Sequence, residues 1–281
     1  MQPTRSGSEE KLALGRAVSV VDQEVWLRRM ADSRWESGLT AGYRTHPGLV
    51  RDSNEDSLFV DARLGMFIVA DGMGGHNAGE VASSIVVRSL PRLIVDALGR
   101  GRDAFVVIKE AFVALDAAIL EISQSRPAWN DMGTTAVMAI ADFDSEKMIV
   151  GHVGDSRAYM INGGAIKRLT EDHSFVAQWV SEGILSPEEA RRHPARHGIF
   201  MALGVGDELQ PSISAWPFTS GDRLLLCSDG LTDMLWDEEI RDIVVHASSP
   251  QAACDELVSR ALDRGGVDNV TVILVSHEPS S

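Results

Sequence analysis

Residues 70–83 have the sequence ADGMGGHNAGEVAS and directly follow the apolar run GMFIV. Asp71 stands where the apolar run ends, three glycines fall between Gly72 and Gly75, and a helical pattern begins after them. The glycines do not form a Walker A loop, which needs GxxxxGK followed by Ser or Thr, and Asn77 stands where a dinucleotide fingerprint needs glycine. A carboxylate at the tip of a buried strand, beside a glycine whose carbonyl an ion can approach closely, suits Mg²⁺ or Mn²⁺. Taken alone, the stretch is explained equally well as a strand-to-helix turn capped by Asp71.

Other acids border apolar strands elsewhere in the chain. Asp229 follows the run RLLLCS, Asp268 precedes the run VTVIL, and Glu55 and Asp56 lie between two strand-like runs. Carboxylates that converged there would repel one another unless cations compensated them, which predicts a binuclear metal site. Arg51, four residues before Glu55, suits a bidentate grip on phosphate oxygens. A surface ion pair with a neighbouring acid is the alternative for this arginine.

The runs around these acids predict an antiparallel β-sandwich. The strand-like segments are short and are separated by Gly, Asn and Asp, and NGG at 162–164 predicts a hairpin. Strands joined by tight turns favour antiparallel sheets over βαβ units. We therefore expect an α+β fold, a four-layer α-β-β-α sandwich with two central, mostly antiparallel sheets flanked by helices. The expected strands cover 38–45, 57–62, 66–70, 134–142, 148–154, 157–162, 165–169, 223–228 and 270–277, and the expected helices cover 78–98, 103–123, 173–192, 237–247 and 250–264.

Composition limits the partners and the compartment of this chain. Its 281 residues carry a net charge of −15, from 26 Lys and Arg against 41 Asp and Glu. An acidic surface of this size disfavours nucleic acid and anionic membranes. Cys227 and Cys254 form neither a disulfide framework nor a zinc motif. No secretory signal and no apolar run of about 18 residues is visible, so we expect a cytoplasmic protein with no membrane association.

Apolar residues at helical spacing also mark residues 8–34, ahead of a body that begins near Ser37. We interpret residues 1–36 as an N-terminal helical or disordered extension and residues 37–281 as one domain. The extension could dock on the domain or bind a partner of its own.

Seven motifs occur in order along the domain: RDSNEDS (51–57), DGMGGH (71–76), MGTT (132–135), GDSR (154–157), LTEDHS (169–174), SDGL (228–231) and VDNVT (267–271). Together they resemble the PPM family, the metal-dependent protein serine/threonine phosphatases of type 2C, in their bacterial form. The resemblance implies a phosphatase catalytic domain over 37–281, with a flap at about 174–200. The run EDHSFVAQWVSEGILSPEEARRHP (171–194) resembles a mobile helix pair of such a flap, and a plain surface helical hairpin is the alternative. The fold of that family, a β-sandwich between helical layers, agrees with the pattern described above.

The resemblance also implies a ligand set and a mechanism. Asp71 would bridge two Mn²⁺ or Mg²⁺ ions, and Arg51 would clamp the phosphate. A third, weaker ion would lie between Asp131 and Asp229. A water bridging the two core ions would be the nucleophile, with no phosphoenzyme. The other ligands that the resemblance implies are Glu55, Asp56, the Gly72 carbonyl, Asp229 and Asp268.

Two departures from the family pattern concern the leaving group and the flap. Many eukaryotic members have a histidine directly after the Asp-Gly pair, proposed as the acid, where this chain has Met73. A metal-bound water is favoured over His76 for that role. Bacterial relatives often close the flap with an Asn-x-x-x-Arg-x-Leu-Gly pattern, whereas this chain has HGIFMALG, with Met201 at the arginine position. The second departure bears on substrate preference and not on the metal chemistry.

The leading hypothesis is therefore a protein serine/threonine phosphatase that opposes a bacterial kinase. Its partners would be phosphoproteins and a cognate kinase, and we expect a monomer. One rival is a non-catalytic module on the same fold, which would be expected to lose core acids that this chain keeps. The other is a different metallo-hydrolase, such as a phosphodiesterase or nuclease, against which the net charge counts.

Overall fold

The computed structural model describes residues 38–74, 78–206 and 208–277. All of them belong to the compact unit Ser37–Ser281. The predicted extension 1–36 lies outside the described residues, as does His76.

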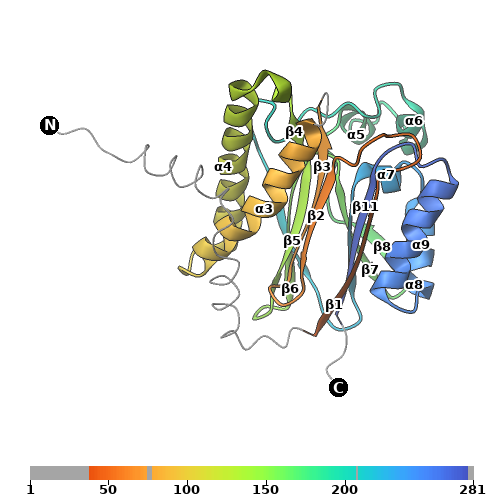
Figure 1. The fold of residues 1–281 in the computed structure, drawn as a ribbon. Coiled ribbons are helices and arrows are strands. Elements are labelled where there is room, and N and C mark those ends of the chain that lie inside the picture. The colour runs from red at the N-terminus through yellow and green to blue at the C-terminus, as the bar shows by residue number, and fades with distance from the viewer. Residues whose placement is uncertain (1–37, 75–77, 207, 278–281) are drawn as a thin grey trace. The chain divides into compact units, whose positions relative to one another are not determined.

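Two antiparallel sheets form the centre of the domain (Figure 1). The first has the order β1 (Leu39–His46), β11 (Val270–His277), β10 (Arg223–Cys227), β7 (Arg157–Asn162) and β8 (Ala165–Arg168). The second has the order β2 (Asp56–Asp61), β3 (Met66–Met73), β5 (Ala136–Asp142), β6 (Lys147–Val153) and β9 (Ser212–Pro217), and the short β4 (Gly133–Thr134) pairs with β3. The predicted fold class is confirmed.

Alternating side chains on the strands build the layers. In β3, Phe67 and Val69 enter the core between the sheets, while Met66 and Ile68 enter the core beneath the helices of that side. In β10, Leu224 and Leu226 face the other sheet, whereas Leu225 and Cys227 face the opposite helical layer. Because side chains alternate across a strand, one apolar run serves two separate cores.

Two pairs of helices cover the outer faces (Figure 1). The helices α3 (Ala78–Leu98) and α4 (Ala104–Ser125) pack on the sheet that contains β3. The helices α8 (Asp237–His246) and α9 (Pro250–Asp263) pack on the sheet that contains β10. Asp103 caps α4 by accepting from Val106 N at 3.0 Å, and Ser249 caps α9 by accepting from Ala252 N at 3.1 Å. A 3₁₀ turn, η1 (Pro127–Trp129), follows α4.

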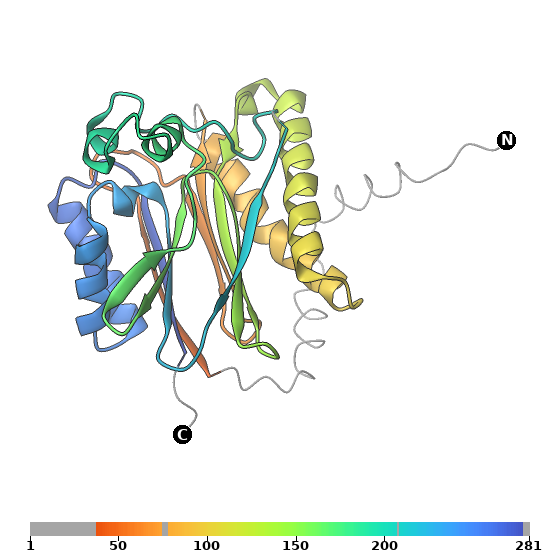
Figure 2. The same ribbon diagram turned by 180° about the vertical axis from the view of Figure 1, so that it is seen from behind.

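The helical pattern over 173–192 forms two short helices, α5 (Phe175–Ser181) and α6 (Pro187–Arg192), as expected for a helix pair. Gly183 ends the first with φ of 73°, a left-handed conformation that favours glycine. Ser186 begins the second with a capping box to Glu189. Figure 2 shows this pair lying across one end of the sandwich, on the side of α8 and α9.

The strand β9 was not predicted from the sequence. It lies at a sheet edge and its residues SISAWP are mostly half-buried, so the run is neither wholly apolar nor cleanly alternating. Within the described ranges, no helix is long and apolar enough to cross a membrane. Cys227 and Cys254 are buried free thiols.

Candidate metal centre

The predicted acids meet at one end of the sandwich. Asp56 and Asp71 are cross-strand partners in β2 and β3. From the other sheet, Ser228 follows β10, and its hydroxyl donates to Asp56 Oδ2 over 2.8 Å. Thr271 N in turn donates to Ser228 Oγ over 3.0 Å. The two sheets are thus joined where Asp229 begins the short helix α7 (Asp229–Thr232).

Burial and neighbouring carboxylates raise the pKa values of Asp56 and Asp71. Burial, the largest effect, raises the pKa of Asp56 to about 7, although hydrogen bonds with Thr271 and Ser228 act in the opposite direction. Burial, followed by the charges of Asp56 and Asp229, raises the pKa of Asp71 well above its usual range. A cation bound between the carboxylates would relieve this repulsion. The charge balance of the site therefore favours cation binding.

Asp155, in the GDSR turn, belongs to the same cluster, and the sequence predicted no role for it. Arg157 pairs with Cys227 in β7 and β10, and continuing that antiparallel register places Asp155 opposite Asp229. Burial, followed by the charge of Asp229, raises the pKa of Asp155 well above its usual range. Two spacings in the sequence could have indicated Asp155. It lies two residues before β7, and the partner strand β10 ends two residues before Asp229.

Backbone packing brings Glu55 beside the end of β3. The Gly72 N–H donates to the Glu55 carbonyl over 3.2 Å, and Ser83 Oγ donates to the same carbonyl over 2.6 Å. A Cβ on Gly72 would lie 2.2 Å from the Gly79 carbonyl oxygen, so only glycine lets β3 approach the first turn of α3 this closely. Burial raises the pKa of the Glu55 carboxyl group, while the neighbouring Arg51 acts in the opposite direction.

Arg51 is paired with Asp268, and not with an acid close to it in sequence. Its Nη2 donates to Asp268 Oδ2 over 2.7 Å, and the arginine side chain keeps 58% of its surface exposed. The next residue, Asn269, accepts from Glu55 N over 2.7 Å and donates to the Ser53 carbonyl over 2.9 Å. One loop thereby anchors the segment that carries both Arg51 and Glu55.

Asp131 lies apart from this cluster in its contacts. It is exposed, in the turn between η1 and β4, with φ of 61°. Its side chain makes no hydrogen bond or ion pair with any residue that the structure describes. A Cβ added to Gly74 would lie 3.4 Å from the Asp131 carbonyl oxygen.

The donor set fits hard divalent cations. It consists of carboxylates and a backbone carbonyl, the oxygen ligands that Mg²⁺ and Mn²⁺ prefer. Asp56 Oδ1 is buried and has no hydrogen-bond partner within the described part of the chain. Burying a carboxylate oxygen without a partner costs free energy. A bound metal ion would supply the partner that Asp56 Oδ1 lacks.

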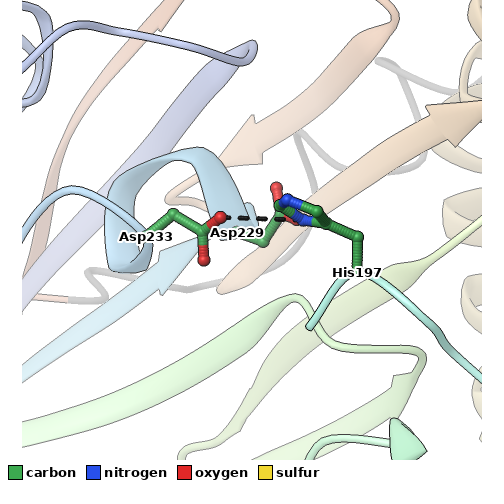
Figure 3. A group of neighbouring side chains, drawn as sticks. All are labelled: His197, Asp229 and Asp233. Atoms are coloured by element: carbon green, nitrogen blue, oxygen red, sulfur yellow. Dashed lines mark ion pairs between the residues drawn. The ribbon is translucent and has the colours of Figure 1, made fainter. Parts of the chain in front are cut away.

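A histidine of the flap, His197, lies close to Asp229 (Figure 3). His197 Nδ1 lies 3.9 Å from Asp229 Oδ2 and 3.7 Å from Asp233 Oδ2. One ligand atom from each of these three residues lies within 4.8 Å of the others. The carboxylate of Asp229 is the main cause that raises the pKa of His197. No role was predicted for His197 or Asp233, because a loop histidine carries no periodic signal.

A cavity of about 500 Å³ opens between the flap and α7. The acids Asp155, Asp229 and Asp233 line it together with residues of α5 and α6. Arg191 of α6 closes one wall, because its Nη2 donates to the Thr232 carbonyl over 2.6 Å and its guanidinium lies 3.9 Å from the ring centre of Trp236. The cavity thus connects the flap with the candidate metal centre.

Comparison with curated proteins finds bacterial phosphatases. The serine/threonine protein phosphatase PstP of Mycobacterium tuberculosis is 40% identical over 231 residues, which are 82% of this chain and 43% of PstP. This chain therefore spans less than half the length of that relative. The serine/threonine phosphatase stp of Listeria welshimeri is 37% identical over 244 residues, which are 85% of this chain and 96% of stp.

Solved structures of bacterial phosphatases also match this chain. The Mycobacterium tuberculosis PstP/Ppp structure matches with a TM-score of 0.78 and 38% identity, covering 86% of this chain and 99% of that one. A PstP catalytic domain in complex with two manganese ions matches with a TM-score of 0.75 and 36% identity, covering 85% and 97% of the two chains. The family model described as protein phosphatase 2C matches residues 50–264. The chain belongs to the protein phosphatase 2C family.

Proposed function

We propose that this chain is a metal-dependent protein phosphatase that hydrolyses phosphoserine and phosphothreonine in proteins and so opposes a bacterial serine/threonine kinase. The observation that carries the proposal is the convergence of Asp56, Asp71 and Asp229 from both sheets at one point. Burial and neighbouring charges raise the pKa values of Asp56 and Asp71, and Asp56 Oδ1 has no hydrogen-bond partner among the described residues. The manganese-bound relative supports a centre of the same kind.

The residues present fit two Mn²⁺ or Mg²⁺ ions. Asp71 would lie between them, and the Gly72 carbonyl would serve one. When bound, the two ions would supply an activated water nucleophile and would stabilise charge on the phosphoryl oxygens. The resemblance to the family adds a third, weaker ion on Asp131 and Asp229. The remaining proposed ligands are Glu55, Asp56, Asp229 and Asp268.

The chain's own residues would hold and orient the phosphate group. Arg51 is exposed and could move from Asp268 to grip two phosphate oxygens, because a guanidinium offers parallel N–H donors. Ser228 holds Asp56 by a 2.8 Å hydrogen bond, and Asn269 holds the backbone of Glu55. Fixed ligand carboxylates reduce the reorganisation needed when charge develops in the transition state.

Partners follow from this reaction. The substrates would be phosphoproteins, the chain would act as a cytoplasmic monomer, and a cognate kinase would supply its substrates. Nucleic acid and membranes are not expected, because the net charge is −15. Hydrolysis of phosphodiesters in place of phosphopeptides would favour the rival metallo-hydrolase.

The test is phosphate release from a phosphothreonine peptide, with and without MnCl₂. We expect activity that requires Mn²⁺ and is abolished by EDTA. Asp229→Asn should lower that activity by at least about 100-fold, because it removes a proposed metal ligand. Asp263→Asn, on the exposed end of α9, is the matched control and should leave it unchanged. A folded wild type that binds Mn²⁺ but releases phosphate from no phosphopeptide would overturn the proposal.

A further inference from the structure

The segments that follow β1 and precede β11 lie against each other, because β1 and β11 are antiparallel neighbours. The Leu49 N–H donates to the Gly266 carbonyl over 2.7 Å, and a Cβ added to Gly266 would lie 3.3 Å from Leu49 Cγ. A Cβ on Gly48, which has φ of 82°, would lie 2.3 Å from the Asp268 carbonyl oxygen, so the two backbones are in direct contact there. We call these two segments the paired loops, residues 47–53 and 265–269.

The paired loops expose apolar side chains directly beside Arg51. Leu49 and Val50 keep 65% and 67% of their surface exposed, and Val267 keeps 41%. Val50 precedes Arg51 in the chain, and Val267 precedes Asp268, whose carboxylate accepts from Arg51 over 2.7 Å. Single exposed apolar residues are ordinary, but a group of them around one charged pair is typical of an interaction surface. This apolar group adjoins the proposed phosphate clamp.

Asn269 holds the paired loops together. Its Nδ2 donates to the Pro47 carbonyl and to the Ser53 carbonyl, each over 2.9 Å, so both ends of the first loop are anchored to the second. The Asn269 side chain is itself buried. A surface that is already ordered loses less conformational entropy when a ligand covers it. The exposed apolar side chains are therefore carried on a preorganised backbone.

The place of the apolar group indicates what would cover it. A substrate whose phosphate lies on Arg51 brings the residues next to its phosphorylated side chain to the same rim. An extended peptide advances about 10 Å in three residues, so the paired loops are within reach of residues one to three places away. Apolar side chains gain free energy when they cover Leu49 and Val50, whereas a charged side chain there would lose water without gaining a partner.

We propose that the paired loops are a docking surface for an apolar side chain of the phosphoprotein substrate, one to three residues from the phosphorylated serine or threonine. The inference rests on the proposed function and adds a sequence preference to it. The surface is separate from the cavity that Asp155, Asp229 and Asp233 line with the flap. It selects among phosphoproteins by the residues that flank the phosphate.

The test compares phosphate release from matched phosphothreonine peptides in saturating Mn²⁺. The background peptide is a short Gly-Ser sequence with a central phosphothreonine, and in the other peptides leucine replaces one flanking residue at a time. We expect the wild type to hydrolyse at least one leucine peptide with a kcat/KM about fivefold or more above that of the background peptide. The difference should lie in KM and not in kcat, because a docked side chain is bound alike in the substrate and in the transition state.

Substitutions in the paired loops should remove this preference. Leu49→Ser should lower the ratio of the two kcat/KM values at least about twofold, because apolar contact area is lost. The double variant Leu49→Ser with Val50→Ser should abolish the preference. Val245→Ser, at a 39% exposed valine of α8, is the matched control and should keep it.

The outcomes separate this inference from the proposed function. Equal kcat/KM values for leucine and background peptides, or a preference that persists in the double variant, would overturn the docking surface and leave the phosphatase standing. A folded wild type that releases phosphate from none of these peptides would overturn the proposed function itself. Sedimentation tests the other occupant of an apolar surface, a second copy of this chain. A wild-type dimer that becomes a monomer in the double variant would assign the paired loops to self-association and overturn substrate docking.

Discussion

Arg51 donates to Asp268 over 2.7 Å, which joins the proposed phosphate clamp to a proposed metal ligand 217 residues away in the chain. The arginine side chain is 58% exposed and that of Asp268 25% exposed. An ion pair this open to water contributes about 0–1 kcal/mol, so exchanging Asp268 for a phosphate group costs little. The pair therefore holds Arg51 near the site without locking it there.

Replacing Arg51 tests the clamp. Arg51→Ala should lower kcat/KM for a phosphopeptide by roughly 100-fold, because charge on the phosphoryl oxygens loses a preorganised donor pair. Arg51→Lys keeps the charge but not the fork, so it should recover only part of the loss. Steady-state kinetics with saturating Mn²⁺ measure both variants. Arg102→Ala, which breaks the exposed pair with Glu110, is the control. A kcat/KM for Arg51→Ala within twofold of the wild type would exclude the clamp.

The pH dependence of stability tests the buried carboxylate Asp56. Burial raises its pKa from 3.8 to about 7 in the folded, metal-free protein. The folded state then binds more protons than the unfolded state between those pH values, so the free energy of unfolding falls as pH rises from about 4 to about 7. This one group contributes a slope of at most about 1.4 kcal/mol per pH unit.

Asp56→Asn cannot ionise and should lose that contribution. In EDTA, its stability relative to the wild type should therefore increase as pH rises from about 4 to about 7. Urea unfolding across this range measures the difference, with Asp263→Asn as control. Added Mn²⁺ should stabilise the wild type more than Asp56→Asn at pH 7, because a cation compensates the wild-type carboxylate. Parallel pH profiles for wild type and Asp56→Asn in EDTA would contradict the argument.

The fold was predictable because apolar alternation is a local signal. Met66 to Ala70 has apolar residues on both faces, and the structure uses both, one toward each core. The edge strand β9 lacks that signal, since one face of an edge strand is only half-buried. The flap was predicted as a helix pair, and Gly183 and the Ser186 capping box divide its two helices.

The acids of the candidate site were predicted from their positions at or near the ends of apolar runs. Asp71, Asp229 and Asp268 meet that condition. Asp155 also follows a predicted strand, 148–154, but its position beside Asp229 depends on the pairing of β7 with β10, strands that are far apart in sequence. His197 depends on the path of the flap loop, which no local pattern determines. The missed residues are thus those brought in by long-range pairing or by a loop.

A buried ion pair beneath the site should matter more than an exposed one. Arg157 makes three hydrogen bonds to the Asp172 carboxylate, which is 7% exposed. Arg157→Ala leaves that carboxylate buried, with Arg168 3.5 Å away, and should cost roughly 3–5 kcal/mol of stability. Arg44→Ala breaks the exposed pair with Asp255 and should cost less than about 1 kcal/mol. Urea unfolding of both variants measures the contrast, and equal losses would contradict it.

Close packing at Gly72 should make this position intolerant of any side chain. An added Cβ would lie 2.2 Å from the Gly79 carbonyl oxygen and 2.6 Å from the Glu55 carbonyl oxygen, so the start of α3 and the Glu55 segment must both shift. We expect Gly72→Ala to lower the free energy of unfolding by roughly 1–3 kcal/mol and to weaken Mn²⁺ binding, because the same backbone carries proposed ligands. At Gly99 the nearest atom would be 3.2 Å away, so Gly99→Ala should change stability by less than about 1 kcal/mol. Thermal unfolding and Mn²⁺ titration calorimetry measure both effects. A Gly72→Ala protein with wild-type stability and wild-type Mn²⁺ affinity would show that the contact between β3 and α3 does not position the metal centre.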